Sequence, residues 1–205
     1  MVQLPFKSSF VEKYSRLTDF EAYRKSVDQF ARKSIRVNTL KTKVATVNKM
    51  LRDSGWILDP VPWCKEGFYV QHEENRRDIG NAPGHAEGFF FAQKSVSMIP
   101  SLALNVSSKH RVLDMAAAPG GKTTHLAALM KNKGELVANE PDTYRMNALK
   151  INLERCGVTN VVLTRNRAEQ FKGLPFDRVL LDAPCSGSGL IKGKTQKSKE
   201  LLQEW

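Results

Sequence analysis

The stretch Val112–Thr124 reads VLDMAAAPGGKTT and decides the fold. Its first residues belong to a short apolar run, Arg111–Met115, which is typical of a buried parallel strand. Small residues and the triplet Pro119-Gly120-Gly121 follow, and the amphipathic run Thr123–Met130 predicts a helix. A strand that enters a helix through a glycine-rich turn is how α/β folds build a nucleotide site, because glycines let the backbone approach a ligand and the helix start offers free N–H groups.

Two common nucleotide-binding motifs do not match this turn. A P-loop needs a glycine where Ala116 stands, and the G-x-G-x-x-G dinucleotide fingerprint is absent from Ala116–Gly121. A second predicted strand, Glu135–Asn139, is followed by Glu140, whose carboxylate is suited to accept both hydroxyls of a ribose. An adenosine ligand without phosphates is therefore expected, and S-adenosylmethionine (SAM) is the natural candidate.

A third segment, Phe176–Gly189, reads FDRVLLDAPCSGSG and predicts a strand with Asp182 and Cys185 just beyond its carboxyl end, where ligands of open α/β sheets bind. With DMAAAPGGKTT and DAPCSGSG together, the chain resembles the Sun family of RNA cytosine-C5 methyltransferases, and most of all its RsmF type. The likeness runs from about Ser34 to Leu190. Shorter matching stretches are Ser34–Lys41 (SIRVNTLK), Pro62–Phe68 (PWCKEGF) and Arg155–Asn160 (RCGVTN).

The resemblance implies an α/β fold, namely a Rossmann-like SAM-dependent methyltransferase sheet, incomplete here, with a small N-terminal α+β domain. We expect residues 1–75 to form an N-terminal helical and small α+β RNA-binding region. Residues 76–205 are expected to form the N-terminal part of the SAM-dependent methyltransferase domain. The implied reaction is SAM-dependent methylation of cytosine carbon 5 in RNA through a covalent thiol adduct, with rRNA favoured over tRNA as the substrate.

The resemblance also implies roles for individual residues. Asp182 and Cys185 are the expected catalytic residues, with Asp182 placed to hydrogen-bond nitrogen 3 of cytosine. Arg36 and Lys41 are expected to contact RNA phosphate and Asn38 to lie near the active-site mouth, although Asn38 is also suited to pair locally with backbone. The expected cofactor-binding residues are Asp114, Ala117, Ala118, Pro119, Gly120, Gly121, Lys122, Glu140, Arg145, Asn166 and Asp182.

The sequence departs from the family pattern in three places. Arg167 stands where an aspartate holds the adenine amino group, and arginine cannot accept that hydrogen bond. Gln93 of a glutamine–glutamate pair is kept, but Lys94 follows it. The family's Thr-Cys-Ser motif, which carries the attacking cysteine, does not occur in the sequence. Chemistry alone makes Cys185 the nucleophile, whereas the resemblance gives Cys185 a role in resolving the adduct.

On this basis we expect a truncated family member that is inactive alone and leaves Val179–Leu181 as an exposed apolar strand edge. Three alternatives stay open. A protein that binds SAM and RNA without catalysis is one. Methylation of an exocyclic amine is another, but DAPC lacks the aromatic residue expected there. A pure RNA-binding module leaves the AAAPGGK turn and Glu140 unexplained.

Length and composition limit the number of domains and the classes of partner that the chain can have. A length of 205 residues with 41% hydrophobic content allows one or two small domains, and a net charge of +11 favours a polyanionic partner, although it also serves solubility. Cys64, Cys156 and Cys185 lie far apart, which predicts neither a metal site nor a disulfide framework. Without a signal-peptide pattern or an apolar run of membrane-spanning length, a cytoplasmic protein is expected.

Overall fold

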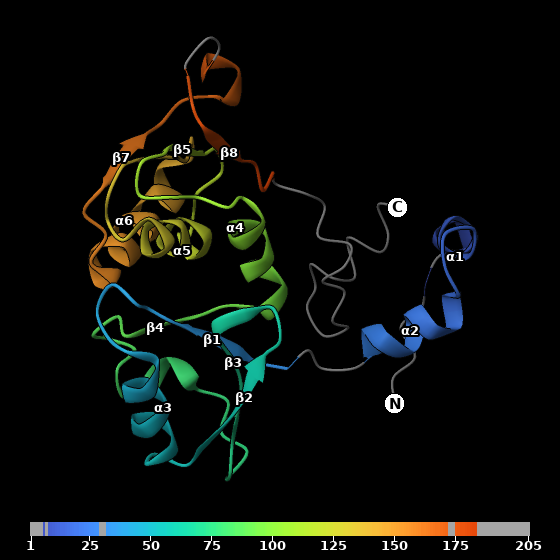
Figure 1. The fold of residues 1–205 in the computed structure, drawn as a ribbon. Coiled ribbons are helices and arrows are strands. Elements are labelled where there is room, and N and C mark those ends of the chain that lie inside the picture. The colour runs from blue at the N-terminus through green and yellow to red at the C-terminus, as the bar shows by residue number, and fades with distance from the viewer. Residues whose placement is uncertain (1–5, 7, 29–31, 172–174, 184–205) are drawn as a thin grey trace. The chain divides into compact units, whose positions relative to one another are not determined.

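The computed structural model describes residues 6, 8–28, 32–171 and 175–183. The chain divides into two compact units, and each is described by itself. In the first unit, helices α1 (Ser8–Ser15) and α2 (Phe20–Asp28) pack aromatic side chains around the buried Phe10. The second unit, residues 32–183, contains two four-stranded sheets (Figure 1).

The first sheet is antiparallel, with the strand order β2-β3-β1-β4. Its central strand β1 is buried along its whole length, because helix α3 covers one face and the second half of the unit covers the other. Ile35 pairs with Phe68 on one side and with Ala92 on the other. The elements are β1 (Ser34–Val37), α3 (Val44–Arg52), β2 (Trp56–Val61), β3 (Cys64–His72), η1 (Ile79–Asn81) and β4 (Phe90–Ala92).

Strand β4 lies beyond residue 75, where the sequence predicts a domain boundary. It pairs antiparallel with β1, with Arg36 opposite Phe91, and so completes the first sheet. The polar segment 75–88 therefore connects two strands of this sheet, and the boundary at residue 75 stays a prediction.

The second sheet is parallel, with the order β7-β6-β5-β8, and confirms the predicted Rossmann-like α/β architecture in its four described strands. Its core packs Val112 and Leu136 of the strands against Leu126 and Met130 of helix α5. The elements are η2 (Ser95–Met98), α4 (Ile99–Ala103), β5 (Arg111–Asp114), α5 (Gly121–Met130), β6 (Glu135–Asn139), α6 (Thr143–Cys156), β7 (Val161–Thr164), η3 (Ala168–Phe171) and β8 (Arg178–Leu180).

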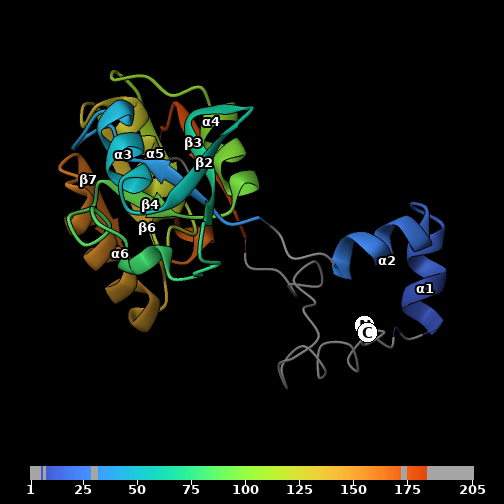
Figure 2. The same cartoon turned by 90° about the horizontal axis from the view of Figure 1, so that it is seen from below.

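Helices α5 and α6 lie between the two sheets in Figure 1, and Figure 2 shows the same layers from below, where they overlap. Two side chains at the end of β1 hold this arrangement together. Arg36 donates to the carbonyl of Gly121 at 2.9 Å and to the hydroxyl of Thr124 at 2.8 Å, both on α5. The amide of Asn38 donates to the carbonyls of Gly88 and Cys156, each at 2.8 Å, and so caps the carboxyl end of α6.

These contacts occupy polar groups of two residues that the sequence analysis placed in the RNA-binding region. Arg36 is 1% exposed and Asn38 is fully buried, so their polar groups serve the joint between the sheets. Lys41 is exposed, but its ammonium donates to the carbonyls of Glu87 and Arg155, each at 2.8 Å, and extends the same joint. A sequence pattern cannot distinguish a cation that binds phosphate from one that binds helix-end carbonyls, because both tasks call for the same donor groups.

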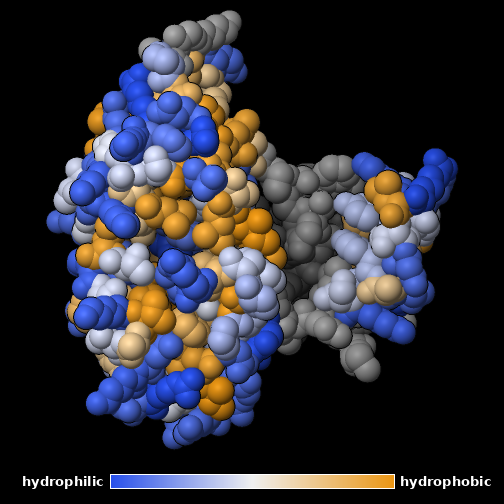
Figure 3. Space-filling view, in the orientation of Figure 1, coloured by the Kyte–Doolittle hydropathy of each residue, from blue (hydrophilic) through white to orange (hydrophobic). Residues whose placement is uncertain are grey.

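The predicted apolar edge is present around β8, which pairs only with β5 among the described strands. Val179 is 45% and Leu181 58% exposed, whereas Leu180 is 6% exposed because alternate residues of a strand face opposite sides. Val96 of η2 and Ile99 at the start of α4 are exposed as well. Figure 3 shows hydrophobic residues gathered over α4 and β8. An apolar strand edge of this kind is an aggregation hazard unless it is covered.

Candidate active site

The four strands of the parallel sheet end at one edge, and the predicted site segments follow them there. Asp114 ends β5, Glu140 follows β6, Asn166 lies two residues beyond β7, and Asp182 lies two residues beyond β8. The register is in step, since Asp114 pairs with Ala138 on one side and with Leu180 on the other. The structure therefore brings these residues to the carboxyl edge, where α/β sheets bind ligands.

The turn after β5 borders a hollow of about 190 Å³. Backbone hydrogen bonds fix the turn, because the Met115 N–H donates to Leu180 at 2.9 Å and the Ala117 N–H donates to Asn139 at 2.9 Å. The predicted residues Ala117, Ala118, Pro119, Gly121, Lys122 and Asp182 line the hollow together with Ala116, Ser97 and residues 91–93. Segments distant in sequence thus build one hollow.

Two glycines are needed in this turn for different reasons. Gly120 is the N-cap of α5 and has a φ of 106°, in the left-handed region that favours glycine. Gly121 faces the hollow, where a Cβ atom would lie 3.1 Å from Oε1 of Gln93 and 3.3 Å from the ring of Phe91. A side chain at Gly121 would crowd the floor of the hollow, so glycine keeps this space open.

Asp114 lies beneath the turn and not in the lining of the hollow. It is 1% exposed and accepts a 2.8 Å hydrogen bond from the hydroxyl of Thr123. Burial raises the pKa of this carboxyl to about 6, and the Thr123 hydrogen bond opposes that rise only in part. The predicted direct contact of Asp114 with a cofactor is thus replaced by support for the turn and the start of α5.

The raised pKa of Asp114 predicts a pH-dependent stability difference. Its folded pKa of about 6 lies above the ordinary aspartate pKa of 3.8, so the native state binds this proton more tightly than the unfolded chain does. The carboxyl therefore costs stability as pH rises from about 4 to about 6, by on the order of 3 kcal/mol in total. In urea unfolding, the free energy of unfolding of Asp114→Asn should rise by about that much relative to that of the native chain between pH 4 and pH 7. A difference that stays constant over this range would contradict the assignment.

Glu140 combines burial with an unsatisfied oxygen. The residue is 1% exposed, and its Oε1 accepts from the backbone N–H of Asp142 at 3.1 Å. Its Oε2 has no hydrogen-bond partner among the described residues and lies 3.5 Å from Arg145, farther than a charged hydrogen bond. Arg145 instead donates to the carbonyl of Ala118 at 2.9 Å and fixes the turn. A buried carboxylate oxygen without a donor is costly, and a ligand hydroxyl would satisfy it.

Asn139, which sequence reasoning missed, holds the edge together. It is 1% exposed, and its amide donates to the carbonyls of Met115 at 3.1 Å and Asn166 at 2.9 Å. Its Oδ1 accepts from the Thr164 hydroxyl and from the Asn166 backbone, each at 2.9 Å. The turn after β5 and the segment after β7 are thereby joined. A polar residue at the last position of a buried strand was the available signal.

Gln93 and the Lys122–Asp182 pair supply the polar groups of the hollow. Both side-chain polar atoms of Gln93 are buried without partners in the described part of the chain. The Lys122 ammonium lies 2.6 Å from Asp182, whose side chain is 58% exposed. An amide with unused donor and acceptor capacity beside a paired carboxylate is suited to hold a polar ligand.

Two models of known protein families match the sequence of this chain. The model for 16S rRNA methyltransferase RsmB/F matches residues 101–204, which include the parallel sheet and the glycine turn. The chain belongs to the RsmB/F methyltransferase family. A second model, for the N-terminal domain of 16S rRNA methyltransferase RsmF, matches residues 6–95. That range ends just beyond β4, in agreement with the strand that closes the first sheet.

Curated relatives of this RsmB/F family member carry the name ribosomal RNA small subunit methyltransferase F. The Vibrio parahaemolyticus protein is 49% identical over 179 residues, which are 85% of this chain and 37% of the relative. The Aeromonas hydrophila protein is 46% identical over 194 residues, covering 88% of this chain and 40% of the relative. The chain thus spans well under half the length of these relatives.

Solved structures show the same fold. A methyltransferase homolog from Pyrococcus horikoshii is 33% identical with a TM-score of 0.76, over 97% of this chain and 72% of that one. The structure described as NSun6 from Pyrococcus horikoshii with SFG has a TM-score of 0.82 over 97% of this chain and 77% of that one. Its identity of 23% supports the fold alone.

The remaining predicted residues of this RsmB/F family member are placed as follows. Cys185 lies outside the described residues. Asn166 is half-buried, and its backbone groups bind Asn139 as described. Arg167, which replaces the expected adenine-binding aspartate, is exposed and pairs with Glu169 at 3.5 Å. The Arg167 guanidinium therefore forms an ion pair at the surface.

The described residues lack two further kinds of feature. No group of three or more His, Cys, Asp or Glu side chains in this part of the chain is arranged to hold a metal ion. None of its helices combines the length and apolar character that crossing a membrane requires.

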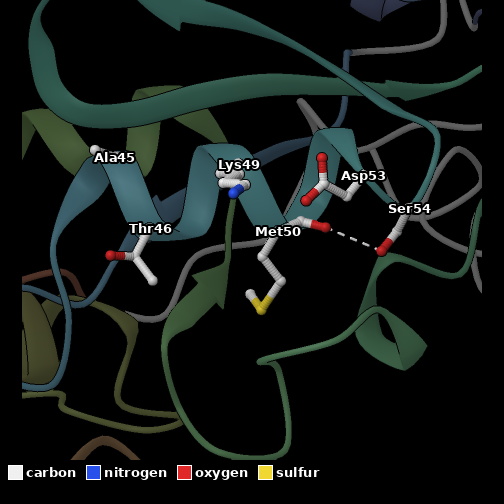
Figure 4. Close-up of a pocket in the computed structure, with 6 residues that line it drawn as sticks. All are labelled: Ala45, Thr46, Lys49, Met50, Asp53 and Ser54. Carbon is white, nitrogen blue, oxygen red and sulfur yellow. Dashed lines mark hydrogen bonds between the residues drawn. The ribbon is translucent and has the colours of Figure 1, made fainter.

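A hollow of about 650 Å³ lies along α3 and its carboxyl end only, with Lys49, Met50 and Asp53 in its lining (Figure 4). It offers no converging polar groups from a second element.

Proposed function

We propose that this chain provides the SAM-binding and RNA-binding part of a methyltransferase that modifies carbon 5 of cytosine in small-subunit rRNA. The observation that carries the proposal is the buried Oε2 of Glu140 at the carboxyl edge, which has no hydrogen-bond partner among the described residues and lies beside a glycine turn without a phosphate-binding fingerprint. The family membership and the names of the curated relatives support the same substrate class. A ribosomal substrate implies a cytoplasmic protein.

The residues present fit SAM. Glu140 would accept the ribose hydroxyls through its unpartnered oxygen, and Ala117–Gly121 would hold the methionine part, with the Gln93 amide in reach of its polar groups. The hollow of about 190 Å³ is sized for part of a cofactor, and Glu140 lies outside its lining. When bound, SAM supplies an electrophilic methyl group.

The chain's own part in the reaction concerns the cytosine. Carbon 5 is a poor nucleophile until a thiolate adds to carbon 6, which makes carbon 5 electron-rich, and a base later removes the carbon 5 proton so that the thiolate leaves. The carboxyl group of Asp182 at the mouth of the hollow would donate a proton to nitrogen 3 of the ring and favour that addition. Lys122, 2.6 Å from Asp182, positions this carboxyl group. Cys185 follows three residues later and would help resolve the adduct.

A chimera tests this proposal. The chain replaces the matching 179 residues of the Vibrio parahaemolyticus relative, and the chimera is incubated with methyl-labelled SAM and 16S rRNA. We expect label on carbon 5 of cytosine, and Asp182→Asn should slow its appearance on the order of a hundredfold, because a positioned proton-bearing group contributes about that much or more. Glu169→Gln, which changes the same type of charge outside the hollow, is the control. Label on an exocyclic amine would contradict the proposal.

A second function, SAM and RNA binding without catalysis, is favoured by Arg167 at the adenine-binding position. The same assay separates the two. A chimera that binds SAM and rRNA but transfers no label to any base assigns the chain to this second function.

A further inference from the structure

A second hollow, of about 550 Å³, lies on the other side of the joint between the sheets. The end of β1, the start of β3 and the second half of α5 build it. It shares no lining residue with the hollow beside the glycine turn. Its volume lies within the range of small-molecule sites, which runs from about 300 to 1,000 Å³. None of the roles derived above uses it.

His125 of α5 is the polar group that most needs a partner in this hollow. It is 2% exposed, and both ring nitrogens lack a hydrogen-bond partner among the described residues. Burial and, secondarily, the charge of Arg36 lower its pKa to about 2. The neutral ring therefore offers one donor and one acceptor. Buried polar groups without partners destabilise the folded chain, so a ligand that pairs with them binds favourably.

The other lining groups define the chemistry of that ligand. Leu40, Ala128 and Leu129 form apolar walls, while Lys65 and Lys131 place two cations at the exposed rim. Glu66, which is 9% exposed, adds a carboxylate acceptor, and its Oε1 lies 3.7 Å from the Lys65 ammonium. A ligand that matches has a flat apolar body, an edge with both donors and acceptors, and an anionic group. A nucleotide has all three, and single-stranded RNA presents its unstacked bases in this way.

The position of the hollow suits a strand that also enters the candidate active site. Gly121, His125 and Ala128 follow the i, i+4, i+7 spacing that puts residues on one helix face. Gly121 lines the first hollow, and the other two line the second. At 1.5 Å per residue, the two hollows lie roughly 6–10 Å apart along α5. A neighbouring part of the same RNA strand spans such a distance.

We propose that the hollow between β1, β3 and α5 binds one unstacked nucleotide of the single-stranded RNA substrate, away from the methylated base. The base edge pairs with His125 and Glu66, and the phosphate lies between Lys65 and Lys131. Arg36 contributes its positive charge from beneath, since its two terminal nitrogens are bound to α5. This inference rests on the proposed function in one respect, namely that RNA is the partner.

A pocket-filling variant tests the site without changing charge. Ala128→Phe places a ring in the hollow, and Ala148→Phe makes the same change at an exposed position of α6. Binding of a fluorescein-labelled 12-nucleotide single-stranded RNA is measured by anisotropy, and binding of SAM by calorimetry. We expect Ala128→Phe to weaken RNA binding about tenfold with SAM affinity unchanged. The Ala148→Phe control should match the native chain in both.

A second pair of variants covers the case in which Ala128→Phe does not fold. Lys131→Glu changes the rim of the hollow, and Lys150→Glu makes the same charge change on the exposed face of α6. In parallel, the ring signals of His125 are followed by NMR during titration with uridine 5′-monophosphate and with inorganic phosphate. We expect a larger RNA-affinity loss for Lys131→Glu than for its control, and shifts of the His125 signals with the nucleotide only.

The outcomes are distinct. RNA binding that both pocket variants leave unchanged, or His125 signals that the nucleotide does not move, would overturn the site while leaving RNA as the partner. Equal losses in Lys131→Glu and Lys150→Glu would reduce the effect to net charge and also overturn it. Failure of the native chain to bind RNA while it still binds SAM would overturn the partner itself.

Discussion

Replacing Glu140 by alanine should weaken SAM binding by more than tenfold. The carboxylate is buried, and its Oε2 has no hydrogen-bond partner among the described residues, so a ribose hydroxyl would supply the missing donor. Loss of a hydrogen bond to a charged group costs about 1.5–3 kcal/mol, which corresponds to a factor of roughly 10 to 150 in affinity. Calorimetric titration of SAM into the native chain and the variant measures this difference.

Glu135→Ala is the matched control for that experiment. Glu135 begins the same strand that ends before Glu140, and its carboxylate forms a half-exposed ion pair with Arg111 at the opposite edge of the sheet. Its loss should leave SAM affinity unchanged. An unchanged affinity in Glu140→Ala as well would remove Glu140 from the cofactor site.

Replacing Gly88 by alanine should destabilise the second unit by on the order of 4 kcal/mol. Gly88 has a φ of 73°, and a Cβ atom there would lie 2.0 Å from the carbonyl oxygen of Arg155 on α6. Its own carbonyl accepts from the buried amide of Asn38. Backbone atoms that must move apart would strain the joint between the two sheets, and losses of this size are confined to such defined causes.

Gly80→Ala provides the comparison for Gly88→Ala. Gly80 lies in the same loop without a positive φ, and the nearest atom to an added Cβ is on His85 at an ordinary 3.9 Å. Urea unfolding should place this control within about 0.5 kcal/mol of the native chain. Similar stability for the two alanine variants would show that the joint tolerates movement at Gly88.

The parallel sheet and the residues at its carboxyl edge could be predicted from the sequence. Apolar runs and small residues indicate strands β5 and β6 and the glycine turn. Because the carboxyl ends of parallel strands meet at the same edge, Glu140 and Asp182 are then expected there. The topology was predictable because it follows from local patterns and a fixed chain direction. The residues that line the hollow beside the turn largely agree with those expected from the glycine-rich stretch.

The joint between the sheets was not predictable from local pattern. Arg36 and Asn38 were expected to face RNA, yet they bind Gly121 and Cys156, which lie 85 and 118 residues away in sequence. Partners at such separations leave no periodicity in either segment. Asn139 was missed as a site residue, and Gln93 was noted without a role, for the same reason, since their contacts depend on what surrounds them in three dimensions.

Hydrogen–deuterium exchange with and without saturating SAM shows whether the cofactor binds at the carboxyl edge of the parallel sheet, because it maps the cofactor site along the chain. We expect slower exchange in residues 115–122, which form the turn and the start of α5, and in residues 139–145 around Glu140. Residues 44–54, along α3, should not change. Binding of SAM that leaves residues 115–122 and 139–145 unprotected, with protection elsewhere in the chain, would contradict the claim that the carboxyl edge of the parallel sheet is the cofactor site.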